Sequence, residues 1–305
     1  MNILLTGANG FVGKNLIPLI AKNNFLTLYD LRQPENHFES NCKIEFIKGD
    51  ISVGENFSKI NWEKLDLILH LAASGVKASN RNWKDCEAVN VNGVKNLLHA
   101  VECLHKIPRL IYPRTFYEDF IDKYEVLKKN PYFFTKYLAT KYILEWAETN
   151  KSAQISFPKI YQAYGPGDDS GNVLSYTLQS LLSHSTAKLS SGNALRDWIY
   201  IDDLNDLFTL TINYNQQKQI EFLDFGTGIL TTVKSMTEFL VKIIGCSDEL
   251  LSFNSALDRQ DVELISCAEH FLPGWLSKYP IEKGLNLFVN IERSKLSKSI
   301  NLLKA

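Results

Sequence analysis

The N-terminus of the chain predicts a strand, a glycine turn and a helix in direct succession. Residues 2–5 are mostly apolar, glycines follow at positions 7, 10 and 13, and helical spacing continues to position 20. Glycine lets a backbone turn tightly and approach a pyrophosphate, while the new helix presents free N–H groups and its positive dipole end. The spacing is G-x-x-G-x-x-G, and in this context it predicts a dinucleotide site at Gly7, Asn9, Gly10, Phe11, Val12 and Gly13.

A second apolar strand, residues 25–30, ends in Asp30. An acid about 20 residues beyond such a turn can accept hydrogen bonds from an adenosine ribose, which favours NAD. Arg32 stands two residues further on and can instead bind the 2′-phosphate of NADP. The sequence therefore predicts NAD or NADP as the cofactor, with NAD favoured.

Strands alternate with amphipathic helices through the first half of the 305 residues. This order predicts an α/β fold, a Rossmann-type doubly wound parallel sheet with right-handed crossovers. We expect a dinucleotide-binding domain over residues 1–165. No Pro/Ser/Gly-rich linker follows it, so residues 166–305 are expected to form mainly a smaller, interleaved substrate-binding lobe. Within that lobe, residues 194–228 partly return to the first domain.

The pattern of apolar residues places the individual elements. We expect further strands at residues 43–47, 65–73, 109–112, 153–160, 197–201 and 220–225, and helices at 83–104, 132–149, 172–183, 202–214 and 233–244.

Composition excludes several classes of function. A net charge of −1 gives no electrostatic case for nucleic acid or an anionic membrane. No apolar stretch approaches the roughly 20 residues that span a bilayer, and a core strand stands where a signal peptide would begin. The five cysteines, the first of them Cys42, are scattered and odd in number. They are expected to be free thiols in a reducing cytoplasm, and no metal-ligand cluster is visible.

Tyr132 and Lys136 stand four residues apart at the start of a predicted helix, so both project from one face. A nearby ammonium favours the phenolate form of a tyrosine, whose pKa is about 10 in model peptides. Pro131 directly precedes the pair, as suits the first turn of a helix. Tyr137 and Lys141 repeat the spacing and are a rival pair. Thr115, at the end of the preceding strand, can offer its hydroxyl to a substrate oxygen.

Together these residues resemble the extended short-chain dehydrogenase/reductase family, in its NAD-dependent nucleotide-sugar epimerase/reductase/dehydratase branch. The resemblance covers nearly the whole chain. It rests on TGxxGFxG at 6–13, D-[LIV] at 50–51, HLAA at 70–73, N-x-x-G-T at 90–94 with Val94 for Thr, P-Y-x-x-[ST]-K at 131–136, YGPG at 164–167 and R-D-[FWY]-[IV]-x-V-x-D at 196–203.

The resemblance implies a role for each matched residue. Tyr132 would be the general acid/base, Lys136 its activator and a ribose contact, and Thr115 the hydroxyl partner. Arg196 would bind the substrate diphosphate, a task suited to a forked guanidinium, and Gln162 replaces an asparagine that contacts the sugar nucleotide. Asp202 and Asp203 are expected to be structural. The remaining implied contacts are Asp50, Ile51, Leu71, Ala72, Ala73, Asn90 and Tyr161 for the cofactor and Ser74 for the substrate.

Aromatic residues of the matched motifs have two possible uses. Tyr161, Tyr164 and Trp198 can stack on a base or sugar, or they can pack in the core.

One motif departs from the family pattern. The family carries S-[ST]-x-x-x-Y-G where this chain has residues 113–120, and 4,6-dehydratases place Asp-Glu directly after the catalytic Thr. Phe116 and Tyr117 occupy those two positions here. A phenyl ring cannot transfer the protons of water elimination, which argues against dehydration. Residues 160–169 resemble the CDP-abequose and CDP-paratose synthases, which reduce a 4-keto sugar.

The resemblance implies hydride transfer at C4 of a nucleotide-linked hexose by a cytoplasmic enzyme. One version is an NDP-4-keto-6-deoxyhexose 4-reductase, and the alternative is an NDP-sugar 4-epimerase with tightly bound NAD. A non-catalytic dinucleotide sensor would not need the Tyr132, Lys136 and Thr115 set.

The resemblance also implies a homodimer through a four-helix bundle of residues 83–104 and 132–149. Apolar positions on these helices suit either that interface or the core: Val94, Leu97, Leu98, Leu138, Ile143 and Trp146.

Overall fold

The computed structural model describes residues 1–34, 43–168, 171–257 and 264–303. Cys42 and Asp169 lie outside these residues. The chain divides into two compact units. The first unit comprises residues 1–160, 205–225 and 270–273, and the second comprises residues 161–204, 226–269 and 274–305. Cys86, Cys103, Cys246 and Cys267 are free thiols, as expected.

The first unit is built on an eight-stranded sheet whose pairings are all parallel. Along the sheet the order is β11-β7-β5-β4-β1-β2-β3, with β6 paired to β7. This order confirms the predicted Rossmann-type doubly wound sheet. The strands are β1 (Asn2–Thr6), β2 (Phe25–Asp30), β3 (Lys43–Lys48), β4 (Leu67–His70), β5 (Arg109–Ile111), β6 (Arg114–Thr115), β7 (Ile155–Ile160) and β11 (Ile220–Phe225).

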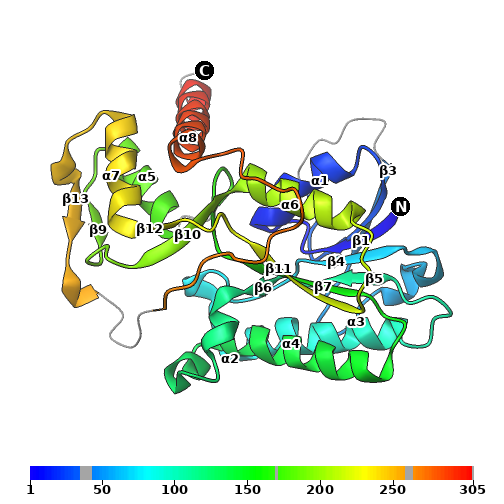
Figure 1. The fold of residues 1–305 in the computed structure, drawn as a ribbon. Helices are drawn as coiled ribbons and strands as arrows, with labels where there is room; N and C mark the ends of the chain where they lie inside the picture. Colours follow the sequence, from blue (N-terminus) through cyan, green and yellow to red (C-terminus); the bar gives the residue numbers. More distant parts are fainter. Residues whose placement is uncertain (35–42, 169–170, 258–263, 304–305) are drawn as a thin grey trace. The chain divides into compact units, whose positions relative to one another are not determined.

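The helices of the first unit cover both faces of the sheet. Figure 1 shows α1 (Phe11–Ile20) and α6 (Ile201–Asn213) on one face and α3 (Gly93–Val101) and α4 (Pro131–Thr149) on the other. Strand β1 therefore lies in the middle of the sheet between two helical layers, where Ile3, Leu4 and Leu5 are completely buried.

Two predicted elements of this unit are longer than the observed ones by more than two residues. The predicted helix 83–104 is α2 (Trp83–Cys86), a π-helical turn (Glu87–Asn92) and α3. The π turn contains Asn90, whose side chain is bonded to the backbone of Ser74. The predicted strand 65–73 ends at His70 because its neighbour β1 ends at Thr6, and the Ala72 N–H donates to the Thr6 hydroxyl instead.

In its described residues, the second unit contains small sheets and three α-helices of its own. A three-stranded sheet has the order β12-β10-β8, and β13 pairs with β9. The three-residue strands of this unit were not predicted from the sequence, because such short strands show no measurable alternation of apolar and polar residues. The last helix was not predicted either. The elements are β8 (Gln162–Tyr164), α5 (Val173–Leu182), β9 (Ala187–Leu189), β10 (Leu195–Tyr200), β12 (Leu230–Thr232), α7 (Val233–Ile244), β13 (Leu251–Phe253) and α8 (Ile281–Leu303).

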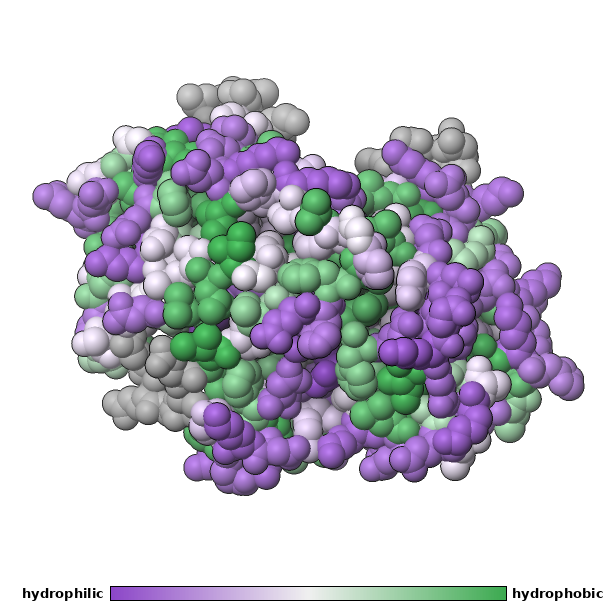
Figure 2. Space-filling model, in the orientation of Figure 1, coloured by the Kyte–Doolittle hydropathy of each residue, from purple (hydrophilic) through white to green (hydrophobic). Residues whose placement is uncertain are grey.

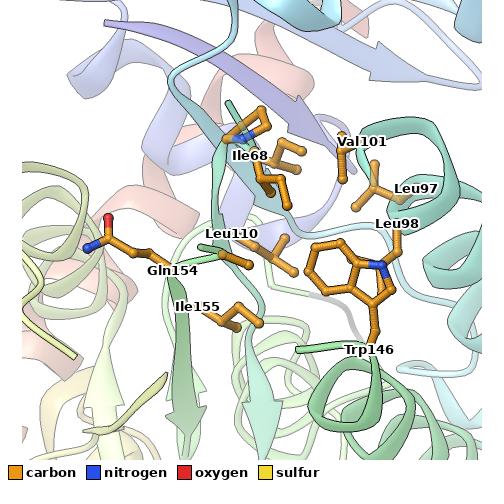
Figure 3. Close-up of a pocket in the computed structure, with 11 residues that line it drawn as sticks. Ile68, Leu97, Leu98, Val101, Leu110, Trp146, Gln154 and Ile155 are labelled. Carbon is orange, nitrogen blue, oxygen red and sulfur yellow. The ribbon is translucent and has the colours of Figure 1, made fainter. Parts of the chain in front are cut away.

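The core of the first unit takes up most of the apolar positions that suited either the core or a dimer interface. Leu138 remains 37% exposed, whereas Val94, Leu97, Leu98, Ile143 and Trp146 are at most 9% exposed. Figure 3 shows the Trp146 indole, from α4, beside Leu98 of α3. The void lined by these side chains measures about 10 Å³, which is too small for any substrate.

No helix in the described part of the chain is both long and apolar enough to cross a membrane. On the face drawn in Figure 2, hydrophilic residues are spread between scattered apolar ones.

Candidate active site

The glycine turn lies against the end of β4 in the first unit. Gly7 has φ +76°, and a Cβ there would lie 2.6 Å from the Ala72 nitrogen. A Cβ at Gly13 would lie 2.5 Å from the Gly7 carbonyl oxygen. Gly10 is the N-cap residue of α1 and makes no side-chain cap, so the first N–H groups of the helix are available to an anion. The cradle therefore fits the pyrophosphate of a dinucleotide.

Asp30 is tied to this turn by hydrogen bonds. The Asn9 N–H donates to Asp30 Oδ2 over 3.0 Å, and the Asn9 side chain donates to the Arg32 carbonyl. Asp30 is half-buried at the end of β2, and Arg32 is exposed. The structure thus brings the predicted ribose-binding acid and the predicted pyrophosphate turn together.

Asp50 and Ile51 follow the end of β3, the strand that pairs with β2. Asp50 Oδ1 accepts the Ser52 N–H over 2.8 Å. Ile51 is 6% exposed, and a Cβ added at Gly93 would lie 3.0 Å from its side chain. Ile51 therefore packs closely on the start of α3, and Asp50 is held at the strand end.

Asn90 fixes the segment after β4. Its Oδ1 accepts the Ser74 N–H over 2.8 Å, and its Nδ2 donates to the Ser74 carbonyl over 3.0 Å and to the Thr135 hydroxyl over 2.9 Å. Both amide hydrogens are thus used inside the protein. Leu71, Ala72, Ala73 and Ser74 are all half-buried beside this clasp.

Tyr132 and Lys136 lie in the first turns of α4. Asn130 caps this helix by accepting the N–H groups of Tyr132 and Phe133, and Pro131 is its first residue. Tyr132 is half-buried, and the Arg81 guanidinium lies 5.8 Å from the centre of its ring. The local sequence thus folds as expected, with Arg81 as an unpredicted neighbour of the tyrosine.

Lys136 is a buried cation. It is 5% exposed, and its Nζ lies 3.7 Å from the centre of the Tyr112 ring. The His70 ring stacks on the same tyrosine at 5.7 Å, and its Nδ1 shares a 2.7 Å hydrogen bond with the Thr6 hydroxyl. The three side chains connect β4, β5 and α4 beneath the glycine turn.

Burial sets the ionisation of this group. It lowers the pKa of Lys136 to about 8. The charge of Arg114 lowers this pKa as well, whereas the charge of Glu118 raises it. Burial also lowers the pKa of His70, to about 3, with help from the charge of Lys136, so this imidazole is neutral. Burial raises the pKa of Tyr132, Glu118 raises it further and Arg81 lowers it.

The rival pair lies elsewhere on α4. Lys141 is exposed, and the Tyr137 hydroxyl donates to the surface carboxylate of Asp122 over 2.8 Å. Of the two pairs, only Tyr132 and Lys136 therefore include a buried lysine, and that lysine contacts Tyr112 at the end of β5.

Thr115 ends β6 and is 8% exposed. It forms a capping box with Glu118, a fully enclosed carboxylate that the sequence analysis did not single out. The signal was present, because T-x-x-E is the pattern of a capping box. Tyr117 stacks on Phe133 at 3.8 Å, and Phe116 is 3% exposed. Neither ring position carries the carboxyl group that the dehydratase pattern has there.

The remaining expected site residues belong to the second unit. Gln162 is half-buried on β8. Arg196 is half-buried on β10, where its Nη1 donates to the carbonyls of Leu195 and Leu264. Asp203 is completely buried and accepts hydrogen bonds from Ser277 and the backbone of residues 278 and 279. Asp202 and Asp203 lie in the first turn of α6 and Asp203 is structural, as expected.

The three aromatic residues with two possible uses are all buried. The Tyr161 hydroxyl donates to the Cys267 carbonyl over 2.8 Å, and the Trp198 indole N–H donates to the Thr231 carbonyl over 2.9 Å. Tyr164 packs against Trp198, Tyr200 and Phe288. These contacts place all three in the core of the second unit.

Neighbouring Asp197 organises the same unit. Its two oxygens accept the backbone N–H groups of Thr227, Gly228 and Ala268 and the Thr227 hydroxyl, over 2.7–2.9 Å. In the sequence, Asp197 is noticeable only as part of the motif at 196–203.

A family model described as the NAD dependent epimerase/dehydratase family matches residues 3–222. The chain belongs to this family. The family predicted from the motifs is thereby confirmed.

Individual relatives are distant but span the chain. A UDP-glucose 4-epimerase of Mycolicibacterium smegmatis is 26% identical and covers 97% of this chain and 99% of its own. A CDP-abequose synthase of Salmonella typhimurium is 22% identical, over 93% and 95% respectively. CDP-abequose synthases are therefore among the relatives, as the sequence analysis expected.

A solved structure shares the fold. It is a variant of UDP-glucuronic acid 4-epimerase from Bacillus cereus, in complex with UDP-4-deoxy-4-fluoro-glucuronic acid and NAD. It superposes with a TM-score of 0.77 at 18% identity, covering 96% of this chain and 98% of that one.

Replacing Lys136 with Met is expected to raise the free energy of unfolding at neutral pH by about 1–3 kcal/mol, because the buried site disfavours the charged amine. The folded pKa of about 8 lies below the unfolded value of about 10.4, so the unfolded chain binds the proton more strongly. The wild-type protein should therefore gain stability relative to K136M as pH rises from about 8 towards 10.

Urea unfolding of both proteins across this range checks the expectation. K141M, which removes an exposed lysine from the same helix, is the control and should give no such gap. A K136M protein less stable than wild type at neutral pH, or a gap independent of pH, would contradict it.

Proposed function

We propose that this member of the epimerase/dehydratase family transfers hydride at C4 of a nucleotide-linked hexose, as an NDP-4-keto-6-deoxyhexose 4-reductase. The carrying observation is that one unit holds both the glycine cradle and the Tyr132, Lys136 and Thr115 set. Helix α4, which bears the first two, packs against β6, which ends in Thr115. The CDP-abequose synthase relatives support the reductive direction.

The cofactor site fits NAD. The cradle at Gly7 and Gly13 admits no side chain, and Asp30 stands where an adenosine ribose needs an acceptor. The first turn of α1 would take the pyrophosphate, and the half-buried Ala72 and Ala73 would lie against the flat ring. When bound in its reduced form, NADH or NADPH would supply the hydride that reduces C4.

The protein's own groups handle the proton and the developing charge. Tyr132 would protonate the C4 oxygen as the carbonyl is reduced. The Thr115 hydroxyl would bond the same oxygen, and Lys136 would stabilise the phenolate and bind the nicotinamide ribose. In the second unit, Gln162 and Arg196 are proposed to bind the sugar and the diphosphate of the substrate.

The site argues against 4,6-dehydration. The two positions after Thr115 hold Phe116 and Tyr117, whose rings pack against each other at 4.1 Å. The next acid, Glu118, already accepts hydrogen bonds from three partners. The two positions where the dehydratases carry Asp-Glu therefore hold no carboxylate that could act on the sugar.

A 4-epimerase is the second candidate, and Asp30 favours it. Its carboxylate, held at the glycine turn by Asn9, suits the free 2′-hydroxyl of NAD. A cofactor that is first reduced and then reoxidised within one turnover is well served by NAD. In this version Tyr132 would first remove the proton of the 4-hydroxyl group.

Cofactor content separates the two versions. The freshly purified protein is denatured, and the released NAD(H) and NADP(H) are quantified. A reductase should release little and should bind added NADH or NADPH. Near-stoichiometric NAD(H) would instead identify the epimerase, and a protein that neither retains nor binds a dinucleotide would contradict both.

Tyr132→Phe is expected to lower kcat by at least about a hundredfold, because the proton donor is lost, while cofactor affinity stays near the wild-type value. Stopped-assay turnover and NADH fluorescence titration measure the two quantities. Tyr137→Phe, which changes the surface tyrosine on the same helix, is the matched control and should keep full turnover. Unchanged turnover in Y132F would overturn the assignment.

We also propose a homodimer through residues 83–104, which include α2 and α3, and through α4. Leu138 is 37% exposed on α4, and Trp83, the first residue of α2, is 47% exposed and contacts Phe134 edge-on at 6.2 Å. An apolar surface of this kind on two neighbouring helices suits a symmetric helical interface.

Leu138→Glu should convert a dimer to a monomer in sedimentation velocity, because it places a charge in the interface. Leu210→Glu changes a leucine on α6 that is even more exposed, at 46%, and should leave the dimer intact. A wild-type monomer at micromolar concentration would contradict this proposal.

A further inference from the structure

Glu118 is a buried carboxylate next to Thr115, one of the three proposed catalytic residues. It is 3% exposed. Its Oε1 accepts the Thr115 N–H over 2.8 Å, and its Oε2 accepts the Thr140 hydroxyl over 2.7 Å and the Arg114 Nε–H over 3.2 Å. A buried charge is tolerated only with such partners, so its position is tightly determined.

The same residue restrains Thr115. In the capping box the Thr115 side chain accepts the backbone N–H of Glu118, while the Glu118 carboxylate accepts that of Thr115. A hydroxyl oxygen that accepts one N–H keeps its own hydrogen to donate. Glu118 therefore holds Thr115 as a donor of fixed orientation.

Glu118 also acts on Lys136. Thr140, which anchors Oε2, stands one helical turn after Lys136 on α4. The charge of Glu118 raises the pKa of Lys136, whereas burial and Arg114 lower it. Tyr132 stands one helical turn before Lys136 on the same helix. Tyr112, whose ring lies under the Lys136 Nζ, and His70 are further titratable groups beside this ammonium. Both are neutral, because burial raises the pKa of Tyr112 and lowers that of His70.

We propose that Glu118 is a positioning residue that orients the Thr115 hydroxyl and serves as the buried counter-charge of Lys136. The proposal rests on the proposed function for the roles of Thr115 and Lys136. The pattern of the branch leaves this third position after the threonine open, and this chain has Glu118 there.

The test begins with the protonation of Lys136 in the protein without ligands. Lysines are labelled with ¹³C at Cε, the Lys136 signal is identified by its loss in K136M, and its midpoint is followed against pH. The wild-type midpoint is expected near 8. In E118Q it should fall by about one pH unit or more, because the anion is gone while the amide fills the same space.

T140V is the matched control. It removes a hydrogen bond to the same carboxylate but keeps the charge, so the Lys136 midpoint should stay at the wild-type value even if stability falls. E118D keeps the charge on a side chain one methylene shorter. It should preserve the midpoint but lower kcat on the order of tenfold, because Thr115 loses its partner.

An E118Q protein with the wild-type midpoint would overturn the proposal, as would a T140V protein whose midpoint falls equally. If E118Q does not fold, an E118D protein with wild-type kcat would overturn it. A wild-type protein that turns over no nucleotide sugar would instead refute the proposed function, and the NMR comparison would still decide the counter-charge role.

Discussion

The backbone of Gly7 lies directly against the backbone of Leu71 and Ala72, and the edge of the first unit that is proposed to bind the dinucleotide depends on this contact. It is possible only because residue 7 has no side chain and adopts φ +76°. The contact sets how closely the glycine turn approaches the end of β4, and thereby the start of α1. Asp30 and Asn9 then fix the turn to β2. The glycine turn thus lies close to the ends of β2 and β4, the two strands that pair with β1.

A second constraint is the burial of charge next to that edge. Lys136 lies against the Tyr112 ring, and Glu118 lies among Thr115, Thr140 and Arg114. Burying an ammonium and a carboxylate costs free energy that packing elsewhere must offset. Such a cost is understandable at a site where protonation states must be controlled, because water no longer screens the groups that set them.

Much of this could be predicted from the sequence because it is local. The strands β2 and β11 and the helix α7 have the predicted bounds, since their apolar periodicity is uninterrupted. Pro131 and the Tyr132–Lys136 spacing likewise fixed the start of α4 within one residue. The π turn at Asn90 could not be predicted, because it accompanies a bond to Ser74, sixteen residues away in sequence. Glu118 was missed because its importance comes from Arg114 and Thr140 together, although its T-x-x-E signature is local.

The proposed function requires that the hydrogen at C4 of the sugar moves by way of the nicotinamide ring. The most direct measurement follows that hydrogen with deuterium. The protein is given a nucleotide 4-keto-6-deoxyhexose with a reduced nicotinamide coenzyme deuterated at its transferable position, and, in parallel, a UDP-hexose deuterated at C4. With the 4-keto sugar, we expect a reductase to deliver deuterium from the coenzyme to C4. With the UDP-hexose, we expect an epimerase to retain deuterium at C4 of a product whose configuration at C4 is inverted. Loss of the label to solvent, or a product that has lost water between C5 and C6, would contradict the proposed function.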